Sequence, residues 1–224
     1  MKRRIALYGG TFDPVHLAHL EVARRLLELF ALDEVLFIPA CVAPHKRRAV
    51  VTPALHRYAM LALATQDDER LRVSTIELDA PGKPYTVDTL QRMQETFGER
   101  VQLFFVMGAD SWAEIATWHE WERLLAISNH IIVTRPGYQV ETSRFAPGLR
   151  ERIVDVRQLD QREIGEQVNG DGEPRIYVTD AVMADVSATS IRASARAGRM
   201  DELLKFVPRP VADYITKYEL YKNE

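Results

Sequence analysis

The sequence predicts an α/β protein built on a doubly wound parallel sheet, with a small helical part at its C-terminus. Three observations support this prediction. Short apolar runs alternate with segments of helical periodicity over most of the chain, a glycine pair follows the first apolar run, and the last forty residues show helix signals alone. This pattern is typical of a Rossmann-like fold. We therefore expect a Rossmann-like core in residues 1–185 and a helical part in residues 186–224.

Size and composition exclude several classes of protein. The chain has 224 residues, of which 46% are hydrophobic and 27% charged, so it can bury an ordinary core. Its net charge of -3 gives no basic field for nucleic acid. Cys41 is the only cysteine, which leaves no intrachain disulfide and no thiolate metal site. No apolar stretch reaches membrane-spanning length and the N-terminal apolar run is too short for a signal peptide, so we expect a cytoplasmic protein.

The first forty residues read as a β-α-β unit. Ile5 to Tyr8 is an apolar run of strand length, and Gly9-Gly10 predicts a tight turn after it. Apolar residues from Leu17 onward then recur at helical spacing, and Val35 to Pro39 forms the second apolar run. Because such a unit is almost always right-handed, the two strands should be parallel.

The alternation continues through the middle of the chain. Thr52-Pro53 combines a capping hydroxyl with a proline suited to the first helical position, and Gly98 is suited to end a later helix. The predicted elements are a helix over 52–65, a strand over 71–78, a helix over 86–97, a strand over 101–107, a helical region over 111–125 and a strand over 130–134.

The C-terminal third is less regular. Residues 137–174 are polar, contain the turn signal Asn-Gly-Asp-Gly at 169–172, and are expected to form a surface excursion. A strand is predicted over 175–179. Ser187 should cap a helix that reaches about Ala197 and stops at Gly198, and the proline pair at 208–210 should introduce a last helix.

The motif GGTFDPVHLAH, at residues 9–19, follows the first strand. In an open parallel sheet, ligands bind where strands end and helices begin. Gly9 and Gly10 allow close backbone approach, while His16 and His19 share one face of the following helix start. Backbone N–H groups at that helix end favour a phosphate, and two imidazoles could donate hydrogen bonds to it.

Simpler interpretations of this motif remain open at this level. The glycines could form an ordinary turn, and the two histidines could be surface residues. A metal site is the weaker alternative, because two histidines without a third ligand nearby lack the usual set. The chain contains neither a G-x-x-x-x-G-K-[ST] loop nor a G-x-G-x-x-G motif, which argues against a P-loop enzyme and a dinucleotide-dependent dehydrogenase.

A second motif, SATSIR, occupies residues 187–192. Ser187 is suited to cap a helix, and Thr189 and Ser190 fall in its first turn. Arg192 adds a planar cation suited to bidentate phosphate binding. Taken alone, the segment is more typical of an ordinary helix cap than of a ligand site.

Together the two motifs resemble a known family. GGTFDPVHLAHL is similar to the signature of bacterial nicotinate-nucleotide adenylyltransferases, within the H-x-G-H nucleotidyltransferase superfamily, although Ala18 stands where that pattern has glycine. SATSIR is similar to the superfamily's I-S-S-T-x-x-R motif. The resemblance implies catalytic roles for His16, His19, Lys46 and Arg192, and ATP-binding roles for Gly9, Gly10, Thr11, Phe12, Ser187 and Thr189.

Segments between the motifs resemble the nicotinate branch of the superfamily. PHK supplies Lys46 from a loop after a strand, and TWHEWE contains a tryptophan similar to the one that stacks on the pyridine ring. Arg57 also resembles a family position, but an exposed charge is an equal interpretation and we leave it outside the site. The resemblance implies that the acceptor is held by Thr86, Gly108, Asp110, Trp118, His119 and Arg135.

The reaction implied by the resemblance joins nicotinate mononucleotide to the AMP half of ATP and releases pyrophosphate. Mg²⁺ would accompany ATP and be held by phosphates and water, with no metal site made of side chains. The alternatives are a relative that uses phosphopantetheine or another phosphorylated acceptor, and a nucleotide-binding sensor without chemistry. We expect no nucleic-acid or membrane partner, and the sequence leaves open whether the chain forms a homo-oligomer.

Overall fold

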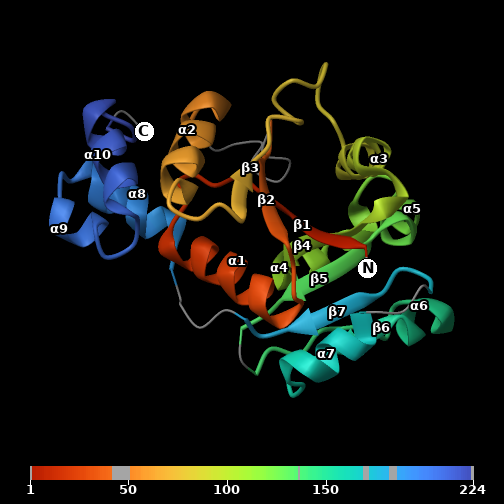
Figure 1. Ribbon diagram of the computed structural model, residues 1–224. Helices are drawn as coiled ribbons and strands as arrows, with labels where there is room; N and C mark the ends of the chain where they lie inside the picture. Colours follow the sequence, from red (N-terminus) through yellow and green to blue (C-terminus); the bar gives the residue numbers. More distant parts are fainter. Residues whose placement is uncertain (1, 42–50, 136, 169–171, 182–185, 223–224) are drawn as a thin grey trace. The chain divides into compact units, whose positions relative to one another are not determined.

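The structure is a computed structural model that describes residues 2–41, 51–135, 137–168, 172–181 and 186–222. Within those residues, seven strands form one sheet in the order β3-β2-β1-β4-β5-β7-β6 (Figure 1). The order reverses direction between β1 and β4, which is the topological switch point of a doubly wound sheet. The expected α/β fold class is confirmed.

Most expected elements are present within a few residues of their expected bounds. The elements up to the fifth strand are β1 (Arg3–Gly10), α1 (Leu17–Leu29), β2 (Glu34–Pro39), α2 (Ala54–Thr65), β3 (Leu71–Val73), α3 (Thr86–Phe97), η1 (Gly98–Arg100), β4 (Val101–Gly108), α4 (Ala109–Ala113), η2 (Ile115–Thr117), α5 (Trp121–Ile127) and β5 (Asn129–Val133). The remaining elements are α6 (Pro147–Glu151), β6 (Ile153–Asp155), α7 (Gln161–Val168), β7 (Ile176–Thr179), α8 (Ala188–Arg196), α9 (Met200–Leu203) and α10 (Arg209–Lys217).

The chain separates into two compact units, which differ from the expected division into 1–185 and 186–224. Unit 1 comprises Met1–Tyr8, Arg24–Val35 and Pro84–Met183, and unit 2 comprises Gly9–Ala23, Leu36–Lys83 and Ala184–Glu224. These two compact units do not show which parts of the chain fold independently. The expected boundary between residues 185 and 186 therefore stays a prediction.

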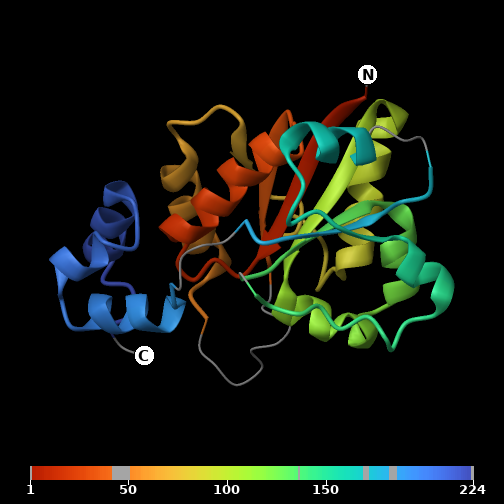
Figure 2. The same ribbon diagram turned by 90° about the horizontal axis from the view of Figure 1, so that it is seen from below.

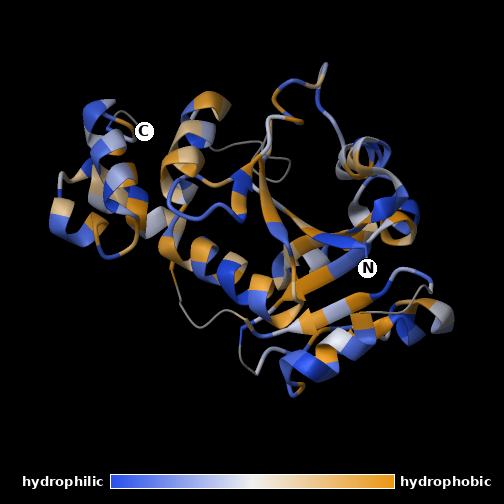
Figure 3. Cartoon of the chain, viewed as in Figure 1, coloured by the Kyte–Doolittle hydropathy of each residue, from blue (hydrophilic) through white to orange (hydrophobic). Residues whose placement is uncertain are grey.

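Unit 1 is built on parallel strands. β1 pairs with β4, β4 with β5, and β7 with both β5 and β6, all in parallel. The central strands are almost wholly buried because helices cover both faces of a doubly wound sheet, and their residues are accordingly apolar (Figure 3). Ile5, Phe104 and Ile131 are each 0% exposed, which places the core of this unit on these strands.

Unit 2 contains both sequence motifs and the whole helical C-terminal part. α8, α9 and α10 lie together in both views (Figures 1 and 2), and α10 packs against α2. His56 on α2 and the Tyr214 hydroxyl on α10 form a hydrogen bond of 2.9 Å. The amide of Leu17, at the start of α1, donates to the Phe206 carbonyl at 2.7 Å. The helical C-terminus is therefore bound to the start of α1 as well as to α2.

The expectation of a surface excursion over 137–174 is wrong. This segment forms α6, β6 and α7, and β6 is the edge strand of the sheet beside β7. Only three residues long and partly exposed, β6 carries too little apolar sequence to be recognised. α7 buries only Ile164 and Val168 along one face, so its composition stays polar. The turn expected at residues 169–171 lies outside the described residues.

Two other expected elements are shorter than predicted. β3 ends at Val73 rather than continuing to residue 78, and the helical region over 111–125 is divided into α4, η2 and α5. The division falls at Glu120, whose φ of 47° places it in the left-handed region and prevents a continuous helix. In the part of the chain that the structure describes, no helix has the length and apolarity needed to cross a membrane.

Candidate active site

The loop after β1 is shaped by contacts between its own residues. Gly9 and Gly10 are the last residues of β1 rather than a turn, and the Gly10 carbonyl accepts a hydrogen bond of 2.9 Å from the Ala40 amide. A Cβ atom at Gly10 would lie 2.8 Å from the ring of Phe12, so any larger residue there would force that ring to shift. Phe12 packs edge-on against Phe37 with ring centroids 5.5 Å apart. The glycine therefore makes room for an aromatic side chain of the same loop.

The two motif histidines lie face to face. The rings of His16 and His19 stack with centroids 3.7 Å apart, and the ring of Phe12 contacts His19 edge-on at 5.0 Å. The His16 amide donates to His19 Nδ1 at 3.3 Å. Because that nitrogen accepts, the proton of a neutral His19 ring sits on Nε2, which is then a hydrogen-bond donor.

Burial keeps both rings uncharged at neutral pH. It lowers the pKa of His16 to about 4. Burial and the nearby positive charge of a protonated His16 hold the pKa of His19 well below its usual value. Neutral imidazoles can still donate one N–H each, so the pair would offer donors rather than cations to a ligand.

Asp13 connects the first motif with the second. Its backbone carbonyl accepts a hydrogen bond of 2.9 Å from Arg192 Nη1, so the guanidinium from α8 is held three residues before His16. Its carboxylate accepts from the Tyr221 hydroxyl at 3.0 Å and from the Thr52 amide at 3.2 Å. Asp13 is only 4% exposed, and it joins segments that are far apart in the sequence.

The start of α8 presents polar groups around a small cavity. Ser187 occupies the capping position, but its side chain forms no capping hydrogen bond within the described residues. Arg192 Nη2 lies 3.4 Å from the Thr189 hydroxyl. A cavity of about 220 Å³ is lined by Val186, Ser187, Ser190, Ile191 and Phe206. The exposed hydroxyls beside this helix start remain able to bind an anion.

Arg57 holds three backbone carbonyls with one buried guanidinium. It is 1% exposed, and Nη1, Nη2 and Nε donate to the carbonyls of Thr11, Ala40 and Thr52 at 2.7, 2.7 and 2.9 Å. Burial lowers the pKa of Arg57, and the negative charge of Asp13 opposes that shift. The bonds join the motif loop to the end of β2 and to the chain just before α2.

Lys46 lies outside the described residues, in the segment 42–50. Arg57 nevertheless binds the carbonyls of Ala40 and Thr52, which stand on either side of that segment. A single side chain thus holds the described residues before and after the segment that carries the expected lysine.

The residues expected to hold the acceptor all belong to unit 1. Tyr85 and His119 stack with ring centroids 4.1 Å apart, which brings the start of α3 next to the segment after η2. Trp118 packs edge-on against Phe105, at 6.4 Å. The residue that caps α3 is Tyr85, whose amide donates to the Asp88 carboxylate at 3.2 Å, and Thr86 is the first residue of the helix. Thr86, Trp118 and His119 are therefore brought to one place.

The other three residues of this set lie where two neighbouring strands end. Gly108 is the last residue of β4 and pairs with Val133, the last residue of β5. Asp110 is exposed in the first turn of α4, for which Gly108 and not Asp110 is the capping residue. Arg135 is exposed two residues after β5. The parallel register thus places this set at the carboxyl edge of the sheet.

Among the described residues, no three or more side chains of histidine, cysteine, aspartate and glutamate gather in a way that could hold a metal ion.

Comparison with known proteins connects these motifs to a family. A family model described as cytidylyltransferase-like matches residues 7–194, a range that includes both motifs. A relative from Thermoanaerobacter sp. strain X514, named "probable nicotinate-nucleotide adenylyltransferase", is 38% identical over 99% of this chain and 95% of its own length. A relative of the same name from Thermus thermophilus is 39% identical over 98% of this chain and all of its own length. The chain belongs to the nicotinate-nucleotide adenylyltransferase family.

Solved structures agree with the fold of this adenylyltransferase family member. The Plasmodium falciparum nicotinic acid mononucleotide adenylyltransferase complexed with NaAD superposes with a TM-score of 0.72 at 19% identity, covering 99% of this chain and 98% of that one. The same enzyme complexed with APC gives a TM-score of 0.69 at 20% identity. At this level of identity the likeness establishes the fold.

Arg57, for which an exposed charge was an equal interpretation, is in fact buried and bound to the Thr11 carbonyl of the motif loop. A signal for it exists, because Arg57, Met60, Leu61 and Ala64 recur at helical spacing and all lie on the buried face of α2. An arginine on an apolar stripe must find partners for its donors. Ala18, in the place of the motif glycine, is 7% exposed within the first turn of α1.

Proposed function

We propose that the chain transfers the adenylyl group of ATP to nicotinate mononucleotide and forms nicotinate adenine dinucleotide and pyrophosphate. The observation that carries this proposal is the hydrogen bond from Arg192 Nη1 to the Asp13 carbonyl. It joins the two phosphate-compatible motifs into one set of donors. The names of full-length relatives at 38% and 39% identity support the same reaction.

The reaction needs positioning and charge stabilisation more than proton transfer. A phosphate oxygen of the acceptor attacks the α-phosphorus of ATP, a new P–O bond forms, and the bond to the bridging oxygen breaks to release pyrophosphate. The acceptor phosphate is already ionised at neutral pH, so no general base and no covalent enzyme intermediate are required.

Residues of both motifs are proposed to bind ATP. His16 and His19 donate N–H groups to the α-phosphate and its bridging oxygen as charge develops there. Lys46, Arg192, Ser187 and Thr189 hold the leaving phosphates. The backbone of Gly9, Gly10, Thr11 and Phe12 approaches the nucleotide. Mg²⁺ bound with ATP would neutralise charge on the phosphates, and it would be held chiefly by them and by water.

The residues proposed to hold the acceptor belong to unit 1. Trp118 is half-buried and presents an electron-rich indole, which suits the positively charged pyridinium ring of nicotinate mononucleotide. Backbone groups near Thr86 and His119 recognise the carboxylate of the ring. Gly108, Asp110 and Arg135 contact the ribose and phosphate, where a carboxylate accepts from hydroxyls and a guanidinium binds the anion.

The proposal is tested with purified protein, ATP and Mg²⁺ against three acceptors: nicotinate mononucleotide, nicotinamide mononucleotide and phosphopantetheine. Pyrophosphate release gives the rate, and mass spectrometry identifies the product. We expect nicotinate adenine dinucleotide as the main product and the highest kcat/KM for nicotinate mononucleotide. A higher kcat/KM with phosphopantetheine would assign another acceptor, and ATP binding without any product would indicate a nucleotide sensor.

A further inference from the structure

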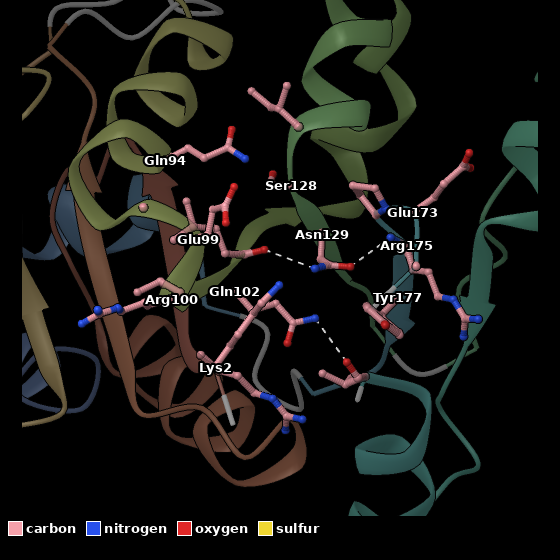
Figure 4. Close-up of a pocket in the computed structure, with 18 of the residues that line it drawn as sticks. Lys2, Gln94, Glu99, Arg100, Gln102, Ser128, Asn129, Glu173, Arg175 and Tyr177 are labelled. Carbon is pink, nitrogen blue, oxygen red and sulfur yellow. Dashed lines mark hydrogen bonds between the residues drawn. The ribbon is translucent and has the colours of Figure 1, made fainter. Parts of the chain in front are cut away.

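A large cavity lies within unit 1 at the amino-terminal edge of the sheet (Figure 4). Its volume is about 1250 Å³, and it is lined where β1, β4, β5 and β7 begin and where α3, α5 and α7 end. The acceptor residues Gly108, Asp110 and Arg135 follow the carboxyl ends of β4 and β5 instead. Because parallel strands have their beginnings at one edge and their ends at the other, this cavity is separate from the proposed acceptor site.

Basic side chains outnumber acidic ones around the cavity. Lys2, Arg100 and Arg175 are exposed and come from three different segments, whereas the lining carboxylates are Glu99 and Glu173. A fourth basic residue, Arg4, is buried and bonded to the backbone of unit 1. The excess of positive charge in a concave surface concentrates field lines and attracts anions.

The C-termini of nearby helices explain why some of these basic residues are present, but not all of them. Helix C-termini carry partial negative charge and attract cations. Arg175 lies at such an end, since its Nη1 donates to the Gln167 carbonyl in the last turn of α7 at 3.5 Å and to the Gln167 side chain at 3.0 Å. Arg100, by contrast, has no hydrogen-bond or ion-pair partner within the described residues, and its exposed guanidinium remains able to bind an anion in the bidentate manner.

Uncharged polar groups form much of the remaining wall. Asn129 Oδ1 accepts from the Arg175 amide at 2.9 Å, and Gln102 Nε2 donates to the Val168 carbonyl at 3.2 Å (Figure 4). These bonds fix the side chains in place. Ser128, only 5% exposed, also lines the cavity, and its buried hydroxyl has no partner in the part of the chain that the structure describes. Such a hydroxyl costs free energy unless a ligand or water satisfies it.

Size and chemistry together select the class of ligand. Small-molecule pockets commonly span roughly 300–1,000 Å³, so a cavity above that range accommodates a nucleotide. Exposed arginine and lysine suit a phosphate, whereas amides and carboxylates suit ribose hydroxyls and the edges of a base. We propose that this cavity is a second nucleotide-binding site, which recognises phosphate together with ribose hydroxyls. The proposal is independent of the function proposed above.

AMP is the probe for this site, and equilibrium dialysis with the full-length chain counts the molecules bound. We expect Arg100→Glu to bind one AMP fewer per chain than the wild type, or to weaken one class of site at least tenfold, because it places a carboxylate where a phosphate would bind. Lys2→Glu is a second variant just before the neighbouring strand, since Arg3 pairs with Val101 and Lys2 therefore lies beside Arg100. Arg92→Glu is the matched control, since Arg92 is exposed on α3 and does not line the cavity.

Two further measurements complete the test. Adenosine and inorganic phosphate should each bind at this site at least tenfold more weakly than AMP, and Arg100→Glu should keep the wild-type rate of pyrophosphate release. Equal AMP stoichiometry and affinity in the wild type and both cavity variants would overturn the proposal. Inorganic phosphate that binds as tightly as AMP would also overturn it, because the cavity would then recognise only an anion.

Discussion

Burial keeps the rings of His16 and His19 neutral, and a neutral imidazole has one N–H to donate. Burial lowers the pKa of both rings, and a protonated His16 would lower that of His19 further. The hydrogen bond from the His16 amide to His19 Nδ1 also selects the tautomer that places the His19 proton on Nε2. Each ring is held by its neighbours, since Phe12 contacts His19 and the two imidazoles stack on each other.

Replacement of His16 tests its part in the reaction. We expect His16→Ala to keep its circular dichroism spectrum and to lower kcat by ~10²–10³, the usual effect of losing one donor to developing charge. Glu21→Ala, at an exposed position on the same helix, is the control and should keep full activity. Near-wild-type turnover in His16→Ala would remove this histidine from the mechanism.

We expect Arg57 to position the loop after β1, because its planar guanidinium donates to three backbone carbonyls at once. Lysine keeps the charge but cannot reach three carbonyls in different directions, and each buried group left unsatisfied costs about 1–3 kcal/mol. We expect Arg57→Lys to lower kcat/KM for ATP at least tenfold and to lower the free energy of unfolding. The KM for the acceptor should change far less, because Arg57 binds only unit 2 backbone.

Arg70→Lys is the matched control for that prediction. Arg70 is exposed and pairs with Asp68 at 3.6 Å, so its replacement should change neither quantity. A uniform loss of stability in Arg57→Lys, with unchanged kcat/KM for ATP, would show that Arg57 supports the fold and does not position the loop.

At the scale of elements, the site depends on where helices begin and on what ties them together. The start of α1 is bound to the Phe206 carbonyl, and Arg192 of α8 is bound to the Asp13 carbonyl. Tyr221, almost at the C-terminus, is 4% exposed and donates to Asp13. Burial and the Asp13 carboxylate raise the pKa of Tyr221, so its hydroxyl stays protonated as a donor. The C-terminal segment therefore supports the first motif.

The Tyr221 hydroxyl gives this link a direct test. Tyr221→Phe leaves one buried oxygen of Asp13 without its donor, which should cost about 1–3 kcal/mol of unfolding free energy in chemical denaturation. We also expect a lower kcat, because Asp13 holds both Arg192 and the motif loop. Tyr218→Phe is the matched control at a position that is 49% exposed. Equal stability of the two variants would show that the Asp13 contact contributes nothing.

Over the whole molecule, buried histidines couple stability to pH. Burial lowers the pKa of His130 in β5 to about 3, and His16 has a pKa of about 4. Both rings bind protons more readily in the unfolded chain, whose histidine pKa is about 6.5. Their contribution to stability is therefore complete above pH 6.5 and is lost as pH falls from there toward the folded-state values.

We expect the free energy of unfolding to fall between pH 7 and pH 5, with each such histidine contributing up to about 1.4 kcal/mol per pH unit. Urea denaturation at pH 7.0, 6.0 and 5.0 measures the slope. His130→Leu should reduce that slope, because it removes a buried ring that binds a proton more readily in the unfolded chain. A slope that His130→Leu does not alter would contradict the assignment.

Much of the fold was predictable because local patterns and tertiary packing agree. The helix over 86–97 was placed to the residue, since Gly98 adopts a φ of 65° and ends it. β6 and α7 could not be placed, because a short edge strand and a helix with one narrow buried face carry little apolar sequence. Trp112 is 1% exposed, whereas Trp121 is half-buried. Both rings contact Phe145, with centroids 5.0 and 5.9 Å away, so the sequence pattern around them does not show which one is fully buried.

The amino-acid sequence by itself determined the fold class, the two motifs and the family they indicate, because periodicity and motif spacing are local properties of a chain. Only the tertiary structure decided that Asp13 accepts hydrogen bonds from Arg192, Tyr221 and Thr52. It also decided that the buried guanidinium of Arg57 binds the loop after β1. Those contacts join residues up to 208 positions apart. A buried donor is satisfied by whichever carbonyl the folded chain brings near, and no local pattern records that choice.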